Sequence, residues 1–192
     1  MRAPATTLLS AALALAFSAT GAMAQDTTHA TQRLELHGDA PAGCVANSAR
    51  ASKQNGTIYQ DNGPTGGVVT FPNLVDQSTA AARASSIQLA VPVVCNTSHV
   101  ITVRSYNGAL VRQGAGGANS AGGFSESQTY GVALQWQNLT TTLGGGTTNA
   151  AIAYGQPAKG DLTIDIAVPR GTQPLVAGTY TDAVVVEIRP TN

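Results

Sequence analysis

Charged side chains are scarce in this sequence of 192 residues, because Asp, Glu, Lys and Arg together make up only 10% of it. Ten basic residues balance ten acidic ones, which leaves a formal net charge of zero at pH 7. Binding to nucleic acid or to an anionic membrane surface depends on a local excess of positive charge. We therefore expect no nucleic acid and no anionic membrane surface among the partners.

Lys and Glu are also few, whereas glycine occurs 21 times and Thr, Ser, Asn and Gln are abundant. This composition disfavours helices and suits short strands joined by turns. The one helical candidate is the short segment 77–84. The composition predicts an all-β protein.

Long apolar runs are absent beyond the N-terminal region. Arg2 precedes an apolar stretch at residues 8–17, and Ala22-Met23-Ala24 forms a small-residue cleavage pattern. This arrangement is typical of a signal peptide, and the stretch is too short to span a bilayer. We expect residues 1–24 to be removed on export, which leaves one ordinary domain without membrane insertion.

Only two cysteines occur, Cys44 and Cys95. An even pair in an exported chain is most simply explained by one disulfide. The alternatives are a metal pair or a redox dithiol, but the chain has no CxxC motif and no neighbouring histidine cluster. A disulfide that closes a loop of about 50 residues would stabilise the fold by about 4 kcal/mol.

Alternation of apolar and polar residues, which marks half-buried strands, is strongest in two segments near the C-terminus. Residues 162–168 carry Leu, Ile or Val at every second position, and a last segment places Val184, Val186 and Ile188 on one face. The sequence ends soon afterwards, at Asn192. We expect the final strand to leave one edge of its sheet open.

Shorter segments of this kind precede these two at fairly regular spacing. They lie at residues 32–37, 68–71, 87–95, 99–105 and 130–136. Pro92 cannot donate a ladder hydrogen bond, so the strand at 87–95 is expected at a sheet edge or with a bulge. The Gly-rich segments 108–128 and 138–160 are expected to be loops or edge segments. Six or seven strands with one disulfide predict an immunoglobulin-like β-sandwich.

Motifs for catalysis or metal binding are missing. Ser120 lies in a Gly-rich stretch without the strand-to-helix turn of a nucleophile elbow, and the histidines lack metal-ligand spacing. Asp165 is on the solvent face of its strand, which does not suit a glycosidase pair with Asp161. Trp136 alternates with Val132 and Leu134, which favours a core position over a sugar-stacking one. We predict no catalytic residues, no metal and no cofactor.

The order of these features resembles the spore coat protein U domain family, which includes subunits of archaic chaperone-usher pili. The resemblance covers most of the mature chain, and its sharpest motifs are the cysteine pair and Gly-Thr-Tyr-Thr-Asp at 178–182. The resemblance also rests on the alternating apolar residues at 34–36, on Val-Pro-Val-Val-Cys at 91–95 and on the apolar segment 100–103.

The resemblance implies an incomplete immunoglobulin-like fold that lacks its last strand and so exposes a groove in the core. A periplasmic chaperone fills such a groove first, and the N-terminal strand of a neighbouring pilus subunit replaces it at an outer-membrane usher. Residues 25–42 would hold the donor strand and residues 43–192 the pilin-like domain. Val184, Val186 and Ile188 would line the acceptor groove.

The donor strand would lie within residues 28–38, and its inward face would read Ala30, Gln32, Leu34, Leu36 and Gly38. Only two of these side chains are large, so residues 32–37 could instead be the domain's own first strand. The resemblance implies a surface fimbrium that supports adhesion or biofilm formation, or a secreted form, and no enzyme. The competing expectation is a self-complete carbohydrate-binding or adhesive sandwich with Trp136 or a Tyr exposed.

Overall fold

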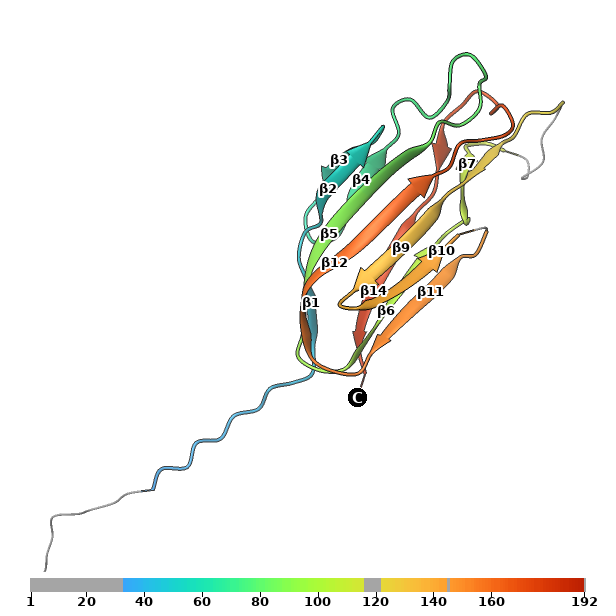
Figure 1. Cartoon of the computed structure of the whole chain (residues 1–192). Coiled ribbons are helices and arrows are strands. Elements are labelled where there is room, and N and C mark those ends of the chain that lie inside the picture. The colour runs from blue at the N-terminus through green and yellow to red at the C-terminus, as the bar shows by residue number, and fades with distance from the viewer. Residues whose placement is uncertain (1–32, 116–121, 145, 192) are drawn as a thin grey trace, which may run out of the picture. The chain divides into compact units, whose positions relative to one another are not determined.

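The computed structural model describes residues 33–115, 122–144 and 146–191, and all regular structure within them is β-strand (Figure 1). The predicted all-β class is therefore confirmed. The chain divides between Asp39 and Ala40 into two units, and the second contains every strand described below. None of the described residues belongs to a helix long and apolar enough to cross a membrane.

The larger of the two main sheets is antiparallel and has six strands. Its order is β1-β5-β12-β9-β10, and β2 pairs with β5 on the same side as β1. Its strands are β1 (Cys44–Ala46), β2 (Arg50–Asn55), β5 (Ser85–Cys95), β9 (Gly131–Trp136), β10 (Leu139–Leu143) and β12 (Ala158–Val168). The long strands β5 and β12 pair along their whole length and form the centre of this sheet.

The second main sheet has three antiparallel strands in the order β11-β6-β14. They are β6 (His99–Ser105), β11 (Asn149–Tyr154) and β14 (Val184–Pro190). Among the described residues β14 pairs only with β6, so its other edge carries no partner strand. The predicted open edge of the final strand is present.

Two small sheets complete the domain. One joins β7 (Ala109–Arg112), β8 (Ser127–Thr129) and β13 (Tyr180–Thr181), and the other is a hairpin of β3 (Ile58–Asp61) and β4 (Gly67–Thr70). The hairpin strands pair only with each other in the described part of the chain.

Both main sheets contribute to one hydrophobic core. Its side chains come from alternate positions of β5, β6, β9, β11 and β12, as period-two alternation requires. The largest fully buried ones include Trp136, Ile87, Ile101, Leu134 and Leu162. Trp136 has no exposed surface, so its predicted core position is confirmed.

The expectation that Pro92 marks an edge strand is wrong, because β5 is paired on both sides, but the pairing register on the side of β1 and β2 shifts by one residue opposite Pro92. Pro92 lies opposite Asp161 of β12, and its carbonyl accepts a hydrogen bond from the Asn47 amide on the other side. Asn47 follows β1 directly, at the break between β1 and β2. A residue's N and carbonyl point to the same side of a strand, so the missing N–H of Pro92 faces this break, where no ladder needs it.

The expected helix at 77–84 is also absent. The Asp76 carboxylate accepts hydrogen bonds from the Ser78 amide and hydroxyl, which forms an Asx turn. Ala80 then adopts a positive φ of 54°, which ends the turn after one α-type hydrogen bond from its amide to the Asp76 carbonyl. Local side-chain hydrogen bonds of this kind compete with helix formation.

The segments expected to be loops or edge segments contain four strands. β7 and the first two residues of β8 belong to 108–128, and β10 and β11 fall within 138–160, where each forms one edge of a main sheet. Leu139 and Leu143 of β10 point inward while the threonines between them alternate, and this pattern could have identified the strand. Ser120 lies outside the described residues.

Candidate strand-binding groove

An apolar groove of about 660 Å³ opens into the core beside the last strand. Its floor is formed by the inward side chains of the two central strands of the large sheet, Leu89, Val91, Leu162, Ile164 and Ile166. One rim is β14, and the other consists of β1 and the β3–β4 hairpin. The groove is therefore a gap in the core between the edges of two sheets.

The rim strand β14 presents Val184, Val186 and Ile188 to this groove. All three are only partly buried, although they pack against the core. On the outer face of the strand, Val185 is 58% exposed. The structure thus places the three predicted acceptor residues together on one wall, and their role as acceptors stays a prediction.

A hydrogen-bond network centred on Asp182 closes one end of the groove. Its carboxylate accepts hydrogen bonds from the hydroxyls of Tyr130 and Ser105, both at 2.6 Å, and from the amide of Asn107 at 3.0 Å. Burial raises the pKa of Tyr130 well above its ordinary value, and the hydrogen bond to Asp182 raises it further. The network fastens the start of β14 to the end of β6 and the start of β9.

This network was not foreseen from the sequence. Asp182 belongs to the Gly-Thr-Tyr-Thr-Asp motif, whose sequence alone indicates a family resemblance but no hydrogen-bond partners. Its partners Ser105 and Tyr130 are 77 and 52 residues away along the chain, and no spacing rule links them.

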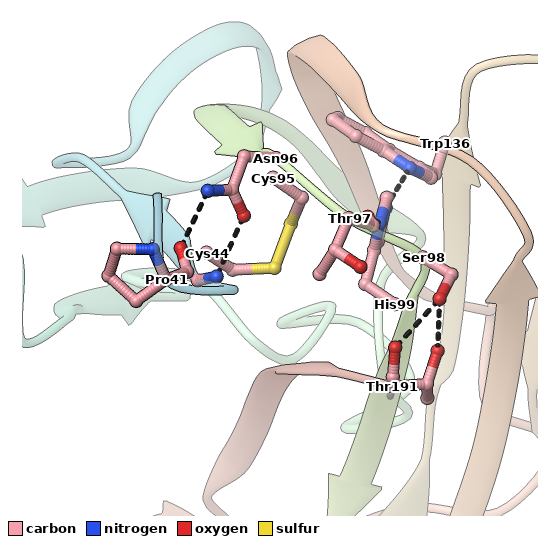
Figure 2. The surroundings of a disulfide bond; sticks show 10 residues. Pro41, Cys44, Cys95, Asn96, Thr97, Ser98, His99, Trp136 and Thr191 are labelled. Carbon is pink, nitrogen blue, oxygen red and sulfur yellow. Dashed lines mark hydrogen bonds between the residues drawn. A yellow bond between two sulfur atoms is a disulfide. The ribbon is translucent and has the colours of Figure 1, made fainter. Parts of the chain in front are cut away.

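The Cys44–Cys95 disulfide lies at the other end of the groove, where it joins β1 to the end of β5. The predicted pairing is confirmed. Beside it, the Asn96 side chain accepts a hydrogen bond from the Gly43 amide and donates one to the Pro41 carbonyl, each at 2.8 Å (Figure 2). The chain just before β1 is therefore held at one point by a covalent bond and two side-chain hydrogen bonds.

The same turn holds the end of β14. The Ser98 hydroxyl donates to the Thr191 carbonyl at 2.7 Å (Figure 2). The Thr191 amide donates to the Ser98 carbonyl at 2.8 Å. Residues 95–98 thus fasten both rims of the groove at this end. Because Asp182 anchors the opposite end of β14, the groove is bounded and its edge strand is held at both ends.

His99 follows in this turn and is fully buried. It comes within 4.8 Å of both cysteine sulfurs, the one grouping of possible metal ligands within the described ranges. The sulfurs are joined to each other, the His99 Nε2 accepts from Trp136, and its Nδ1 lies 2.9 Å from the Thr97 carbonyl. These ligand atoms are all engaged, so the cluster does not form a metal site as it stands.

The N-terminal segment differs from the expected strand at 32–37. Residues 33–43 form no strand, and the Leu34 and Leu36 side chains are 77% and 87% exposed. Arg33 and Glu35, which alternate with the two leucines along the segment, form an ion pair at 3.2 Å. Ala30 and Gln32, the other predicted donor residues, lie outside the described residues.

A scan against protein-family models gave no match to this chain, and a search of curated proteins gave none either.

Proposed function

We propose that this protein is the structural subunit of a surface fibre in which each copy accepts a β-strand from the next. The observation that supports the proposal most directly is the apolar groove beside the unpaired edge of β14. An edge strand with free backbone groups next to exposed core side chains is a template for strand addition. On this proposal the domain is an incomplete immunoglobulin-like sandwich.

The proposed occupant is the segment 28–38 of a second copy of this chain. Leu34 and Leu36 are exposed large apolar side chains at alternate positions, while Arg33 and Glu35 place charge on the opposite face. An added strand would bury the leucines against Val184, Val186 and Ile188 and leave the charges outside. Burial of two leucines contributes roughly 3 to 6 kcal/mol, and hydrogen bonds to β14 add to it.

The arrangement also explains why a fibre would form. Each copy carries one donor segment and one groove, so the contact joins different surfaces of successive copies. A contact of this heterologous kind builds an open chain when its rotation does not close a ring. Before assembly the exposed groove would promote aggregation. On this proposal a periplasmic chaperone covers the groove, and an outer-membrane usher is the place where the strand of the next copy replaces the chaperone.

The alternative function, a self-complete carbohydrate-binding module, has less support. Stacking on a sugar needs an accessible aromatic ring, and the single tryptophan is wholly buried. Tyr106 is 84% exposed and is the remaining candidate for stacking on a sugar. A sugar site at Tyr106 would not explain the apolar groove, which Tyr106 does not line. We therefore favour the fibre subunit, with export, a cell-surface location and support of adhesion or biofilm formation as parts of the same proposal.

The experiment that tests this function places charge on the proposed donor face. Leu34→Asp with Leu36→Asp would bury uncompensated carboxylates in the groove of the neighbour, at a cost far above what the leucines contribute. We expect electron microscopy to find no fibres, whereas export, disulfide formation and co-purification with the chaperone persist. Normal fibres would contradict the donor assignment, and degradation without capture would indicate an internal strand.

The matched control is Arg33→Asp with His37→Asp, which adds two carboxylates to the opposite face of the same segment. These side chains would face away from the groove, and both are exposed in the free chain. We expect fibres from this variant. Loss of fibres in both variants would show that added charge, not the face that carries it, blocks assembly.

A further inference from the structure

The Tyr59 hydroxyl is the one buried side-chain polar atom for which the described part of the chain provides no hydrogen-bond partner. Tyr59 lies on β3 and lines the groove, together with Val69 of the neighbouring strand β4. Buried polar groups in folded proteins are nearly always paired, and each exception asks for an explanation. The ring of Tyr59 lines the groove that we propose accepts a strand, while the hydroxyl itself is covered from solvent.

The position of the ring is held by its own hairpin. Tyr59 pairs with Val69, and its ring covers Gly67, two residues away on the same face of β4. A Cβ at Gly67 would overlap the hydroxyl, so the glycine provides the space that the phenol occupies. An aromatic ring over a cross-strand glycine is a recurrent way of stabilising such a pair.

The Tyr59 phenol is protonated and can therefore donate a hydrogen bond. Burial raises the pKa of Tyr59 above its ordinary value, and the nearby Asp61 carboxylate raises it further. The group therefore keeps its proton throughout the physiological range and can donate one hydrogen bond. A strand that enters the groove carries carbonyl oxygens along both of its edges, which are acceptors of the required kind.

We propose that the strand that fills the groove shifts the Tyr59 ring from its covered position, and that the Tyr59 hydroxyl then donates a hydrogen bond to a carbonyl oxygen of this strand and helps to select and position it. The inference rests on the proposed function, because it takes segment 28–38 of a second copy as the occupant. The carbonyl belongs either to the main chain of that segment or to the Gln32 side chain, which falls on its predicted inward face.

The test uses the mature chain with Leu34→Asp and Leu36→Asp, which cannot donate its own strand but keeps its groove. A synthetic peptide of residues 28–38 is titrated into this protein and into the same protein with Tyr59→Phe. We expect the substitution to raise the Kd for the peptide about tenfold, equivalent to ~1.4 kcal/mol. Tyr106→Phe is the matched control, since that hydroxyl is on an exposed side chain, and it should leave the Kd unchanged.

A second measurement distinguishes recognition from a structural role. Without peptide, Tyr59→Phe should unfold at the same temperature as its parent or a higher one, because it removes an unpaired buried group. Equal Kd values for the two proteins would overturn the inference, and so would a clear drop in the unfolding temperature of the free variant. If the parent protein binds no peptide at all, the proposed function fails instead.

The source of the carbonyl is found with a peptide carrying Gln32→Leu. If the tenfold difference between Tyr59 and the Tyr59→Phe variant persists with this peptide, the acceptor is a main-chain carbonyl. If the difference disappears, the acceptor is the Gln32 side chain. Either result supports the hydrogen bond.

Discussion

The indole Nε1 of Trp136 donates a hydrogen bond to Nε2 of His99 at 2.8 Å in the fully buried core. The other ring nitrogen of His99 lies 2.9 Å from the Thr97 carbonyl. An acceptor at Nε2 requires the neutral tautomer that carries its proton on Nδ1, and this proton then points at Thr97. The pair ties the turn between β5 and β6 to strand β9 of the large sheet.

We predict that His99 and Trp136 are energetically coupled. His99→Leu leaves the indole N–H unpaired, and Trp136→Phe leaves the His99 acceptor unpaired, so each should destabilise the fold by about 2 to 4 kcal/mol. The double variant should lose less than the sum, by about 1 to 2 kcal/mol. Urea unfolding followed by circular dichroism measures all three, and strict additivity would show that the bond contributes nothing.

The disulfide should contribute strongly to the free energy of unfolding. Replacing Cys44 and Cys95 together by serine should lower the free energy of unfolding by about 4 kcal/mol, because the unfolded chain regains a long loop. The oxidised protein, denatured without reductant, should show no free thiol on labelling. Stoichiometric labelling would refute the pairing.

Alkaline pH should destabilise the domain through Tyr130. Its pKa is raised in the folded state, so above the ordinary tyrosine value near 10 the unfolded chain ionises first and stability falls as the pH rises. Tyr130→Phe should be less stable at pH 7, by about 1.5 to 3 kcal/mol for the lost bond to a carboxylate, but should show a flatter alkaline decline. Denaturant midpoints between pH 8 and 11 test this, and parallel curves would contradict it.

The turn at residues 95–98 should control the end of β14. Ser98→Ala with Thr191→Val removes the two hydroxyls while it keeps the main-chain bond between these residues. We expect a loss of about 1 kcal/mol in stability and faster amide exchange at the C-terminal end of β14, with exchange at its Asp182 end unchanged. Uniform exchange changes along the whole strand would argue against a local fastening.

The class of fold and the core strands could be predicted because their sequence pattern is strong. Period-two alternation identified the strand that carries Trp136 and the face of β14 that carries Val186. The pairing of Cys44 with Cys95 needed no geometry, since only two cysteines exist. These are local or combinatorial inferences, and tertiary structure did not override them.

The rest depends on contacts between distant segments. The sequence indicates an edge position for Pro92. In the structure, β1 and β2 pair with β5 along one edge, one on each side of Pro92 in the sequence of β5, and β12 pairs along the other edge. The partners of Asp182 and the orphan hydroxyl of Tyr59 are likewise set by packing, which no residue spacing encodes. The groove itself follows from which edges face each other, so the sequence could suggest the open strand β14 as one wall but not the floor or the opposite rim.

The central claim, that β14 accepts an added strand, is tested most directly by amide hydrogen exchange along residues 184–190 with and without the peptide 28–38. Alternate amides of an edge strand point away from β6 and should exchange rapidly in the free protein carrying Leu34→Asp and Leu36→Asp. Saturating peptide should slow these amides strongly, whereas β10, the edge of the other sheet, should be unaffected. Unchanged exchange in β14 with the peptide bound would contradict strand addition at this edge.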